Sequence, residues 1–324
     1  MMKSIVSIEL TLLSLLLIAT CAPAKPSAQS KLGVFVGTSP CDAVARRPLG
    51  IPATADCEMI KWSLTVDREP GTLAPTTYEL NFAYGMTQPN TTGFKNGGTE
   101  LARQGKWAMA QGTKTDSTSL VYKLDAERPE ESISFVKLDD NLLHLLDADR
   151  SLAVGTAGWS YTLSRTVPQR LPTNSPSAAG TSAAQTTATT KSSSLRGAAS
   201  SVLGRFVGRS PCVEVAREMN QTVEADCIKV KWDLTLYQDS RTSAPTTYTL
   251  DGTFYRDHTR KGTWKMLRGA RTNPEAVLYQ LDPDASQGSL LFLKADDNIF
   301  YFLDRSRDLL VGNQNFSYTL NRFR

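Results

Sequence analysis

The chain has 324 residues, of which 40% are hydrophobic, 21% charged and 8% aromatic, a composition typical of globular proteins and a length sufficient for about two domains. Its formal net charge of +4 is small, so no large basic field indicates a nucleic-acid-binding protein. Residues 31–165 hold 14 Lys and Arg against 16 Asp and Glu, a net charge of −2, and residues 204–324 hold 17 against 15, a net charge of +2. Neither half is therefore predicted to bind a polyanion.

Residues 1–24 are predicted to be an export signal. Lys3 gives a positive start, and the apolar run at 10–19 is too short for a membrane span, which needs about 20 apolar residues. Two cleavage modes remain open. The stretch LIATC (17–21) resembles a bacterial lipobox that would leave Cys21 lipidated, whereas APA (22–24) is a small-x-small site for ordinary cleavage after Ala24. Both modes place the mature protein outside the cytoplasm, lipid-anchored at the outer membrane in the first case and soluble in the periplasm or secreted in the second.

An internal repeat organises the rest of the chain. FVGTSPC (35–41) recurs as FVGRSPC (206–212), ADCEMIKWSLT (55–65) as ADCIKVKWDLT (225–235), and APTTYEL (74–80) as APTTYTL (244–250). From GKWAM (105–109) onward, which recurs as GTWKM (262–266), the offset between the copies is 157 residues instead of 170 or 171. The second copy therefore lacks about 13 residues of a Gly-, Asn- and Thr-rich segment that is typical of a surface loop. We predict one domain at 31–165 and a second copy of it at 204–324.

Four cysteines occupy matching positions in the two copies. In an oxidising compartment an even set of cysteines indicates disulfides, and the repeat pairs Cys41 with Cys57 and Cys212 with Cys227. Each bridge closes a loop of about 15 residues and contributes roughly 3 kcal/mol in the chain-entropy model. We predict no metal site and no cofactor, because the chain has only two histidines and they do not occupy matching positions.

Each copy is predicted to contain about eight short strands. Residues 60–66 and 76–84 alternate apolar and polar side chains with a period of two, as half-buried strands do. Further apolar runs lie at 107–109, 120–124, 133–138, 142–146 and 159–163. No long amphipathic helix is evident. The pattern predicts an all-β fold, either an up-and-down antiparallel barrel or a sandwich, and closure as a barrel would remove exposed sheet edges.

Residues 166–203 are predicted to be a disordered linker. They are rich in Ser, Thr and Ala and nearly free of large apolar side chains, so they cannot bury enough surface to fold. Two domains of opposite net charge on such a linker are either independent binding units or a simple duplication of one module, and we favour duplication.

Four tryptophans recur in the two copies: Trp62, Trp107, Trp232 and Trp264. They are candidates for lining a ligand cavity inside each barrel. Aromatic side chains at such positions more often fill the core, and we favour that interpretation.

No catalytic residues are predicted. Asp139 and Asp140 lie between two apolar runs and are interpreted as turn formers at a hairpin tip. His144 lies inside an apolar run and is replaced by Tyr301 in the second copy, so we interpret it as a strand residue on the polar face.

The opening motifs of the two copies are GVFVGTSPC (33–41) and GRFVGRSPC (204–212). Later short motifs follow in the same order in both copies, namely GKW (105–107) with GTW (262–264), LLD (145–147) with FLD (302–304), and YTL (161–163) with YTL (318–320). In this order the motifs resemble the NlpE N-terminal domain family of copper resistance lipoproteins, present here as two tandem copies.

The resemblance implies two small lipocalin-like barrels on an outer-membrane lipoprotein linked to surface sensing, envelope stress and copper tolerance. The family has a short Cys-x-x-Cys, whereas the wide spacing here indicates structural disulfides rather than a redox or metal site. We expect a non-catalytic envelope lipoprotein that senses or binds an envelope protein or small ligand, with no nucleic acid as partner. The alternative is a periplasmic carrier that holds a small hydrophobic ligand inside one barrel.

Overall fold

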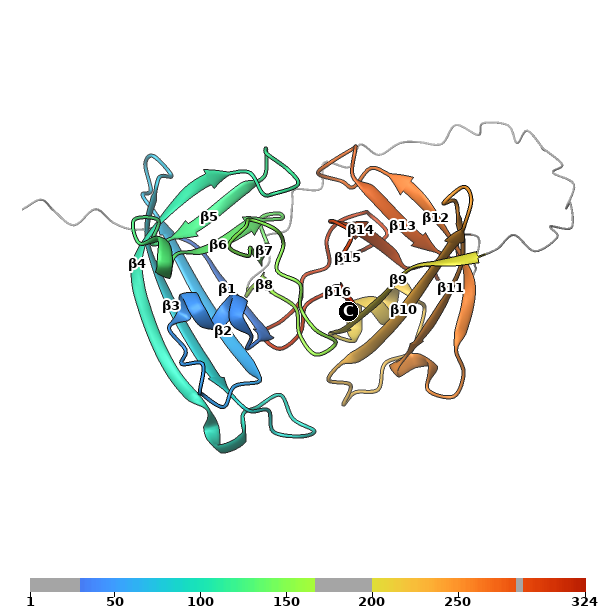
Figure 1. Cartoon of the computed structure of the whole chain (residues 1–324), viewed down its shortest axis with the longest axis horizontal. Coiled ribbons are helices and arrows are strands. Elements are labelled where there is room, and N and C mark those ends of the chain that lie inside the picture. The colour runs from blue at the N-terminus through green and yellow to red at the C-terminus, as the bar shows by residue number, and fades with distance from the viewer. Residues whose placement is uncertain (1–29, 167–199, 284–287) are drawn as a thin grey trace, which may run out of the picture.

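The computed structural model describes residues 30–166, 200–283 and 288–324. The predicted export signal with Cys21 and most of the predicted linker lie outside these residues. The described chain forms two closed, eight-stranded antiparallel barrels that lie side by side (Figure 1). The prediction of an all-β fold with two tandem barrels is confirmed. Within the described ranges, no helix has the length and apolar character needed to cross a membrane.

In the first barrel each strand pairs with the next, and β8 closes the barrel against β1. Its strands are β1 (Ser30–Pro40), β2 (Met59–Arg68), β3 (Pro75–Gly85), β4 (Thr99–Gln111), β5 (Leu120–Leu124), β6 (Ile133–Lys137), β7 (Leu142–Leu145) and β8 (Thr162–Arg165). The connections contain the helix α1 (Ala43–Leu49) and the 3-10 turns η1 (Lys95–Gly97) and η2 (Pro129–Glu131).

The second barrel repeats this order, and β16 closes it against β9. Its strands are β9 (Ser200–Ser210), β10 (Val230–Asp239), β11 (Pro245–Gly252), β12 (Arg260–Arg268), β13 (Val277–Leu281), β14 (Leu291–Lys294), β15 (Ile299–Leu303) and β16 (Thr319–Arg322). Its connections contain α2 (Val213–Glu218) and η3 (Thr253–Tyr255).

The alternating pattern of the strands builds each core. In β3, Tyr78, Leu80 and Phe82 are buried, while the side chains between them are more exposed. The turn predicted at 139–141 is present, because the Asp139 carboxylate accepts a hydrogen bond from the backbone N–H of Asn141 at 2.7 Å. Aspartates here form a turn, as the sequence pattern indicated.

A short helix follows the first strand of each barrel. Helices of six or seven residues are too short to show a helical period, so the sequence pattern did not predict α1 and α2. Each helix is tied to its own barrel by a buried tyrosine, because Tyr161 donates to Asp42 at the start of α1 and Tyr318 donates to Glu214 of α2.

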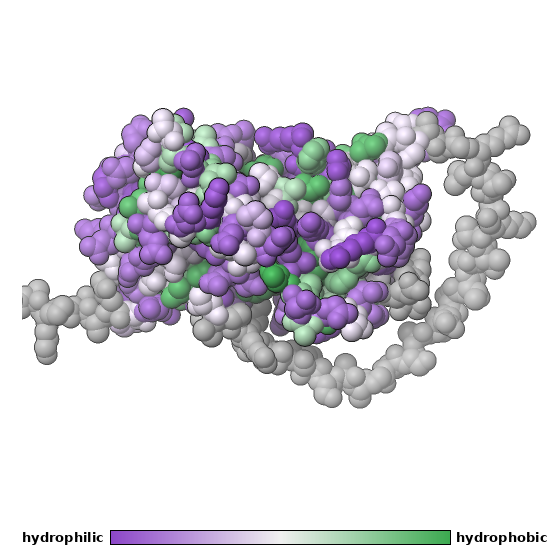
Figure 2. All heavy atoms as spheres, turned by 90° about the horizontal axis from the view of Figure 1, so that it is seen from below, coloured by the Kyte–Doolittle hydropathy of each residue, from purple (hydrophilic) through white to green (hydrophobic). Residues whose placement is uncertain are grey.

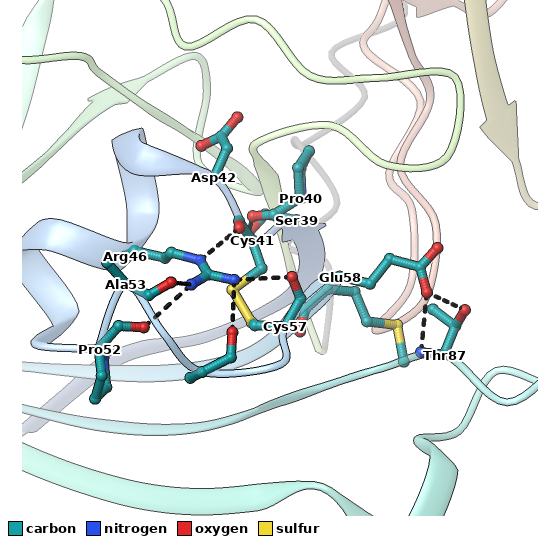
Figure 3. The surroundings of a disulfide bond; sticks show 12 residues. Ser39, Pro40, Cys41, Asp42, Arg46, Pro52, Ala53, Cys57, Glu58 and Thr87 are labelled. Atoms are coloured by element: carbon teal, nitrogen blue, oxygen red, sulfur yellow. Dashed lines mark hydrogen bonds between the residues drawn. A yellow bond between two sulfur atoms is a disulfide. The ribbon is translucent and has the colours of Figure 1, made fainter.

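A disulfide joins each helix region to the next strand. Cys41 is bonded to Cys57 and Cys212 to Cys227, with Cα–Cα separations of 5.7 and 6.3 Å, as the repeat predicted. In the first copy Arg46 reinforces the bridge, because its guanidinium donates to the carbonyl oxygens of both Cys41 and Cys57 at 2.8 and 3.0 Å (Figure 3). The bridges therefore hold the end of β1 beside the start of β2, and the end of β9 beside the start of β10.

Candidate functional site

The four repeated tryptophans lie in the barrel cores. Each is 3–5% exposed. Their indole N–H groups donate to the same positions in both copies: Trp62 to Ser39 Oγ, Trp232 to Ser210 Oγ, Trp107 to the carbonyl of Asp67 and Trp264 to the carbonyl of Tyr237. Because both the rings and the N–H groups are engaged, these side chains stabilise the barrels, which agrees with the favoured interpretation.

A second repeated cluster joins an arginine, an aspartate and a tyrosine. In the first barrel Tyr78 and Arg103 both donate to the Asp125 carboxylate, and in the second Tyr248 and Arg260 donate to Asp282 in the same way. These charges neutralise each other inside the protein, so the cluster stabilises the fold. This cluster was not predicted from the sequence, although all three residues recur at the repeat offsets.

The barrels pack against each other through equivalent residues. Ser160 Oγ lies 2.6 Å from Ser317 Oγ, and Thr162 Oγ1 lies 2.9 Å from Thr319 Oγ1, each pair separated by the repeat offset of 157 residues. Contacts between matching residues are the mark of an isologous, two-fold interface. The two copies therefore form an intramolecular pseudo-dimer and are not independent units.

The interface buries the outer faces of β7 and β15, which lie at the centre of Figure 1. Its apolar cluster consists of Val121, Val136, Leu146, Leu152, Ile299 and Tyr301, with side chains of both barrels around it. The interpretation of His144 as a polar-face residue was wrong, because the second barrel covers that face.

His144 is fully buried, with its ring centroid 5.6 Å from that of Tyr301. Its Nδ1 lies 2.9 Å from Thr162 Oγ1 and its Nε2 lies 2.9 Å from the carbonyl oxygen of Ala153. Burial lowers the pKa of His144 to about 4, while the Ala153 carbonyl opposes this shift. The imidazole is therefore neutral near pH 7, and these contacts make it part of the interface.

Large exposed apolar side chains do not identify a docking surface. The face seen in Figure 2 is mostly hydrophilic, with apolar side chains in small separate patches. Leu73, Val202 and Phe323 are more than half exposed, and only Val202 and Phe323 belong to the same barrel, where Phe323 lies beside β9. Single apolar residues on a surface are normal, so a polar hollow between the barrels is the stronger candidate.

We define the interbarrel cleft as a hollow of about 370 Å³ whose walls come from both barrels. It is lined by Thr38, Glu58, Met59, residues 87–92 and Trp159 of the first barrel and by Arg209, Lys229, Lys231, Asn315 and Phe316 of the second. This volume is within the range of small-molecule sites.

The first wall of the interbarrel cleft contains the segment that only the first copy has. The connection between β3 and β4 extends from the lower end of the first barrel towards the second (Figure 1). Glu58 anchors it, because the carboxylate of Glu58 accepts hydrogen bonds from the backbone N–H and the hydroxyl of Thr87 (Figure 3). Since Glu58 follows Cys57 directly, the first disulfide helps to position this wall.

The second wall carries three cations, of which two lie on the neighbouring strands β9 and β10 and the third directly precedes β10. Arg209 of β9 lies directly opposite Lys231 of β10, and Lys229 lies two residues before Lys231. The guanidinium of Arg209 lies 5.7 Å from the centre of the Trp159 ring, and Nζ of Lys229 lies 5.7 Å from that of Phe316. Across the described residues, none of the three cations forms a salt bridge.

Burial lowers the pKa values of two of these three cations. Burial lowers the pKa of the Lys229 ammonium, and the charges of Arg209 and Lys231 lower it further. Burial also lowers the pKa of Arg209, while the nearby Glu58 carboxylate opposes that change. The interbarrel cleft thus combines three positive charges with one negative charge.

The structure offers no evident metal centre in the part of the chain that it describes. There, no group of three or more His, Cys, Asp or Glu side chains is placed to hold an ion. All four described cysteines are in disulfides, so they present no free thiolate to a soft metal. No family model matches the chain, and comparisons with curated proteins and with solved structures found no similar one.

Proposed function

We propose that this chain is a non-catalytic binding protein of the bacterial cell envelope that holds its ligand between its two barrels. The observation that carries the proposal is the interbarrel cleft, whose walls come from both copies and include a segment found in only one of them. A simple duplication would give two equivalent surfaces, whereas this hollow is asymmetric and has unpaired charges.

The cellular location rests on three supports. The two disulfides are consistent with an oxidising compartment outside the cytoplasm. The sequence predicts an export signal with Cys21 as a lipid attachment point, and the motif order resembles NlpE-type envelope lipoproteins. A ligand bound between the barrels would then be sensed at the envelope surface or in the periplasm.

The alternative of a carrier that encloses a hydrophobic ligand has less support. In both barrels the tryptophan rings occupy the core. In the second barrel Phe206 and Phe300 also stack there, with ring centroids 3.9 Å apart. A ligand inside a barrel would have to displace these packed rings.

Native mass spectrometry of the protein, purified under mild conditions from its own cells, tests the proposal. We expect a small molecule to be retained and to be recovered chemically unchanged. Replacing residues 88–93 by Asn-Gly, which keeps the pairing of Thr87 with Phe94 but removes the tip of the cleft wall, is expected to abolish retention.

The matched control replaces residues 240–243, the tip of the β10–β11 hairpin, by the same two residues. This tip is not part of the cleft, so the control should retain the ligand. Retention by both variants would point to a site inside a barrel and would contradict the proposal.

The copper tolerance implied by the family resemblance is tested separately by titrating the oxidised protein with copper. Because the described cysteines are paired, we expect no stoichiometric binding below micromolar concentration. Tight stoichiometric binding would restore copper as the ligand of this protein.

A further inference from the structure

The three cations of the interbarrel cleft are arranged at a cost to the fold. Arg209 and Lys231 are cross-strand partners, and like charges directly opposite each other destabilise an antiparallel pair. Lys229, which directly precedes β10, adds a third charge to the lining of the same cleft. No carboxylate among the described residues forms an ion pair with any of them.

The first copy shows that the fold does not require this arrangement. At the positions equivalent to Arg209 and Lys229 the first copy has Thr38 and Met59, and only Lys61 keeps its charge as the counterpart of Lys231. Thr38 and Met59 line the same cleft as Arg209 and Lys229, but from the opposite barrel. The extra cations are therefore specific to the side of the cleft that faces the added segment.

From this geometry we propose that the interbarrel cleft binds a phosphomonoester, a dianionic phosphoryl group carried on a small organic body. The inference rests on the proposed function, namely binding between the barrels, and adds the chemistry of the ligand. Three cations against the single carboxylate of Glu58 leave two positive charges, which match the two negative charges of the phosphoryl group.

The donors in the cleft suit this chemistry. The planar guanidinium of Arg209 rests on the Trp159 ring and offers paired N–H donors that match phosphate oxygens, while Lys229 and Lys231 supply compact ammonium charges. Arg209 and Lys229 are partly buried, which strengthens their attraction for an anion relative to a fully hydrated site, whereas Lys231 is exposed. The volume of about 370 Å³ also leaves room for an organic body beside the phosphoryl group.

The residues of the first copy indicate which substitutions to make in the second. Arg209→Thr and Lys229→Met give the second copy the residues that the first copy already accommodates at these positions. Lys261→Thr and Lys265→Met, on the exposed side of β12, remove the same total charge away from the cleft and serve as the control.

The experiment is isothermal titration of the full-length oxidised protein with glycerol phosphate, with inorganic phosphate, and with glycerol as the neutral probe. We expect saturable 1:1 binding of glycerol phosphate, weaker binding of inorganic phosphate and none of glycerol. The double variant Arg209→Thr/Lys229→Met should bind glycerol phosphate at least tenfold more weakly. The Lys261→Thr/Lys265→Met control should stay within twofold of the unaltered protein.

A second arm distinguishes a soluble phosphomonoester from a lipid headgroup. Phosphatidylcholine vesicles with and without phosphatidic acid are added to the same proteins in a sedimentation assay. Binding that requires phosphatidic acid and is lost in the double variant supports the inference with a lipid as the source of the phosphoryl group. Glycerol phosphate binding without vesicle binding supports it with a soluble source.

Two results would overturn the inference. One is the absence of saturable binding by every phosphate probe, and the other is equal affinity of the unaltered protein and the double variant. If native mass spectrometry at the same time finds a ligand that requires residues 88–93 but not Arg209 or Lys229, the proposed function stands and only the ligand chemistry fails. If no ligand depends on the cleft, both fail.

Discussion

Acidification is expected to weaken the contact between the barrels through His144. The buried imidazole is neutral in the native state, with its pKa lowered by burial to about 4 from an ordinary value of 6.5. Between these two values the unfolded chain binds a proton that the folded protein does not. The stabilisation by neutral His144 is therefore complete above pH 6.5 and is lost as the pH falls to about 4.

The size of this effect follows from the difference in pKa. The difference of about 2.5 between the two pKa values, at about 1.4 kcal/mol per pH unit, gives an upper limit of about 3.5 kcal/mol. Roughly 3 kcal/mol of this is lost between pH 7 and pH 4, because the folded-state imidazole is itself about half protonated at pH 4. Burial also raises the pKa values of Asp139 and Asp296, so carboxylates contribute to the pH dependence of stability as well. A comparison with a variant that lacks only the imidazole removes their contribution.

The assay is urea unfolding between pH 7 and pH 4 of the unaltered protein, His144→Gln and His258→Gln. Glutamine keeps hydrogen-bonding groups near Thr162 and Ala153 but does not titrate. His258 is exposed, so His258→Gln should follow the unaltered protein throughout. The stability difference between the unaltered protein and His144→Gln should fall by about 3 kcal/mol on acidification. Parallel profiles for these two proteins would refute the argument.

Three further predictions concern the fold and the packing of the barrels. Tyr78→Phe and Tyr248→Phe should each lower the free energy of unfolding in urea by about 1–2 kcal/mol, because each loses one hydrogen bond to a buried carboxylate. Clearly unequal losses of stability would contradict equivalent roles for the two tyrosines. Replacing Cys212 and Cys227 together by alanine should lower the free energy of unfolding by about 3 kcal/mol in the same assay. An unchanged urea midpoint would contradict a stabilising role for this disulfide. Ile299→Asp places a carboxylate in the apolar cluster between the barrels, so it should separate them. The radius of gyration in small-angle X-ray scattering should then increase, while circular dichroism still shows a β-rich protein. An unchanged radius would show that the contact does not depend on this apolar cluster.

The barrels and their bridges could be predicted because the information for them is local or repeated. Alternation along β2 and β3, turn residues at 139–141 and duplicated cysteines each appear directly in the sequence. The two short helices could not be predicted, since seven residues do not establish a helical period. The hydrogen bonds that Tyr161 and Tyr318 donate to Asp42 and Glu214 join these helices to residues that lie far along the chain.

The contact between the barrels was harder to predict, although a signal was present. The run LLHLL at 142–146 is apolar at consecutive positions, which indicates burial on both faces of a strand rather than on one. The barrel core accounts for only one face of such a strand. A second domain covering the other face would have explained both this run and the sequence IFYFL at 299–303.

The interbarrel cleft depends on information that one copy alone does not contain. The differences between Thr38 and Arg209, and between Met59 and Lys229, are visible when the copies are aligned. Whether those side chains face solvent, a partner or each other depends on the two-fold packing, which no local pattern encodes. The insertion between Leu80 and Gly105 was interpreted as a surface loop, but its two ends extend β3 to Gly85 and begin β4 at Thr99. Its contact with the second barrel was not predicted.

The paired arrangement of the barrels is tested most directly by cross-linking across the two-fold interface. The hydroxyl oxygens of Ser160 and Ser317 are 2.6 Å apart and belong to different barrels. In the double variant Ser160→Cys/Ser317→Cys, peptide mapping without reductant should find positions 160 and 317 joined, with both native bridges intact. Free thiols at both positions in correctly bridged protein would contradict the pseudo-dimer.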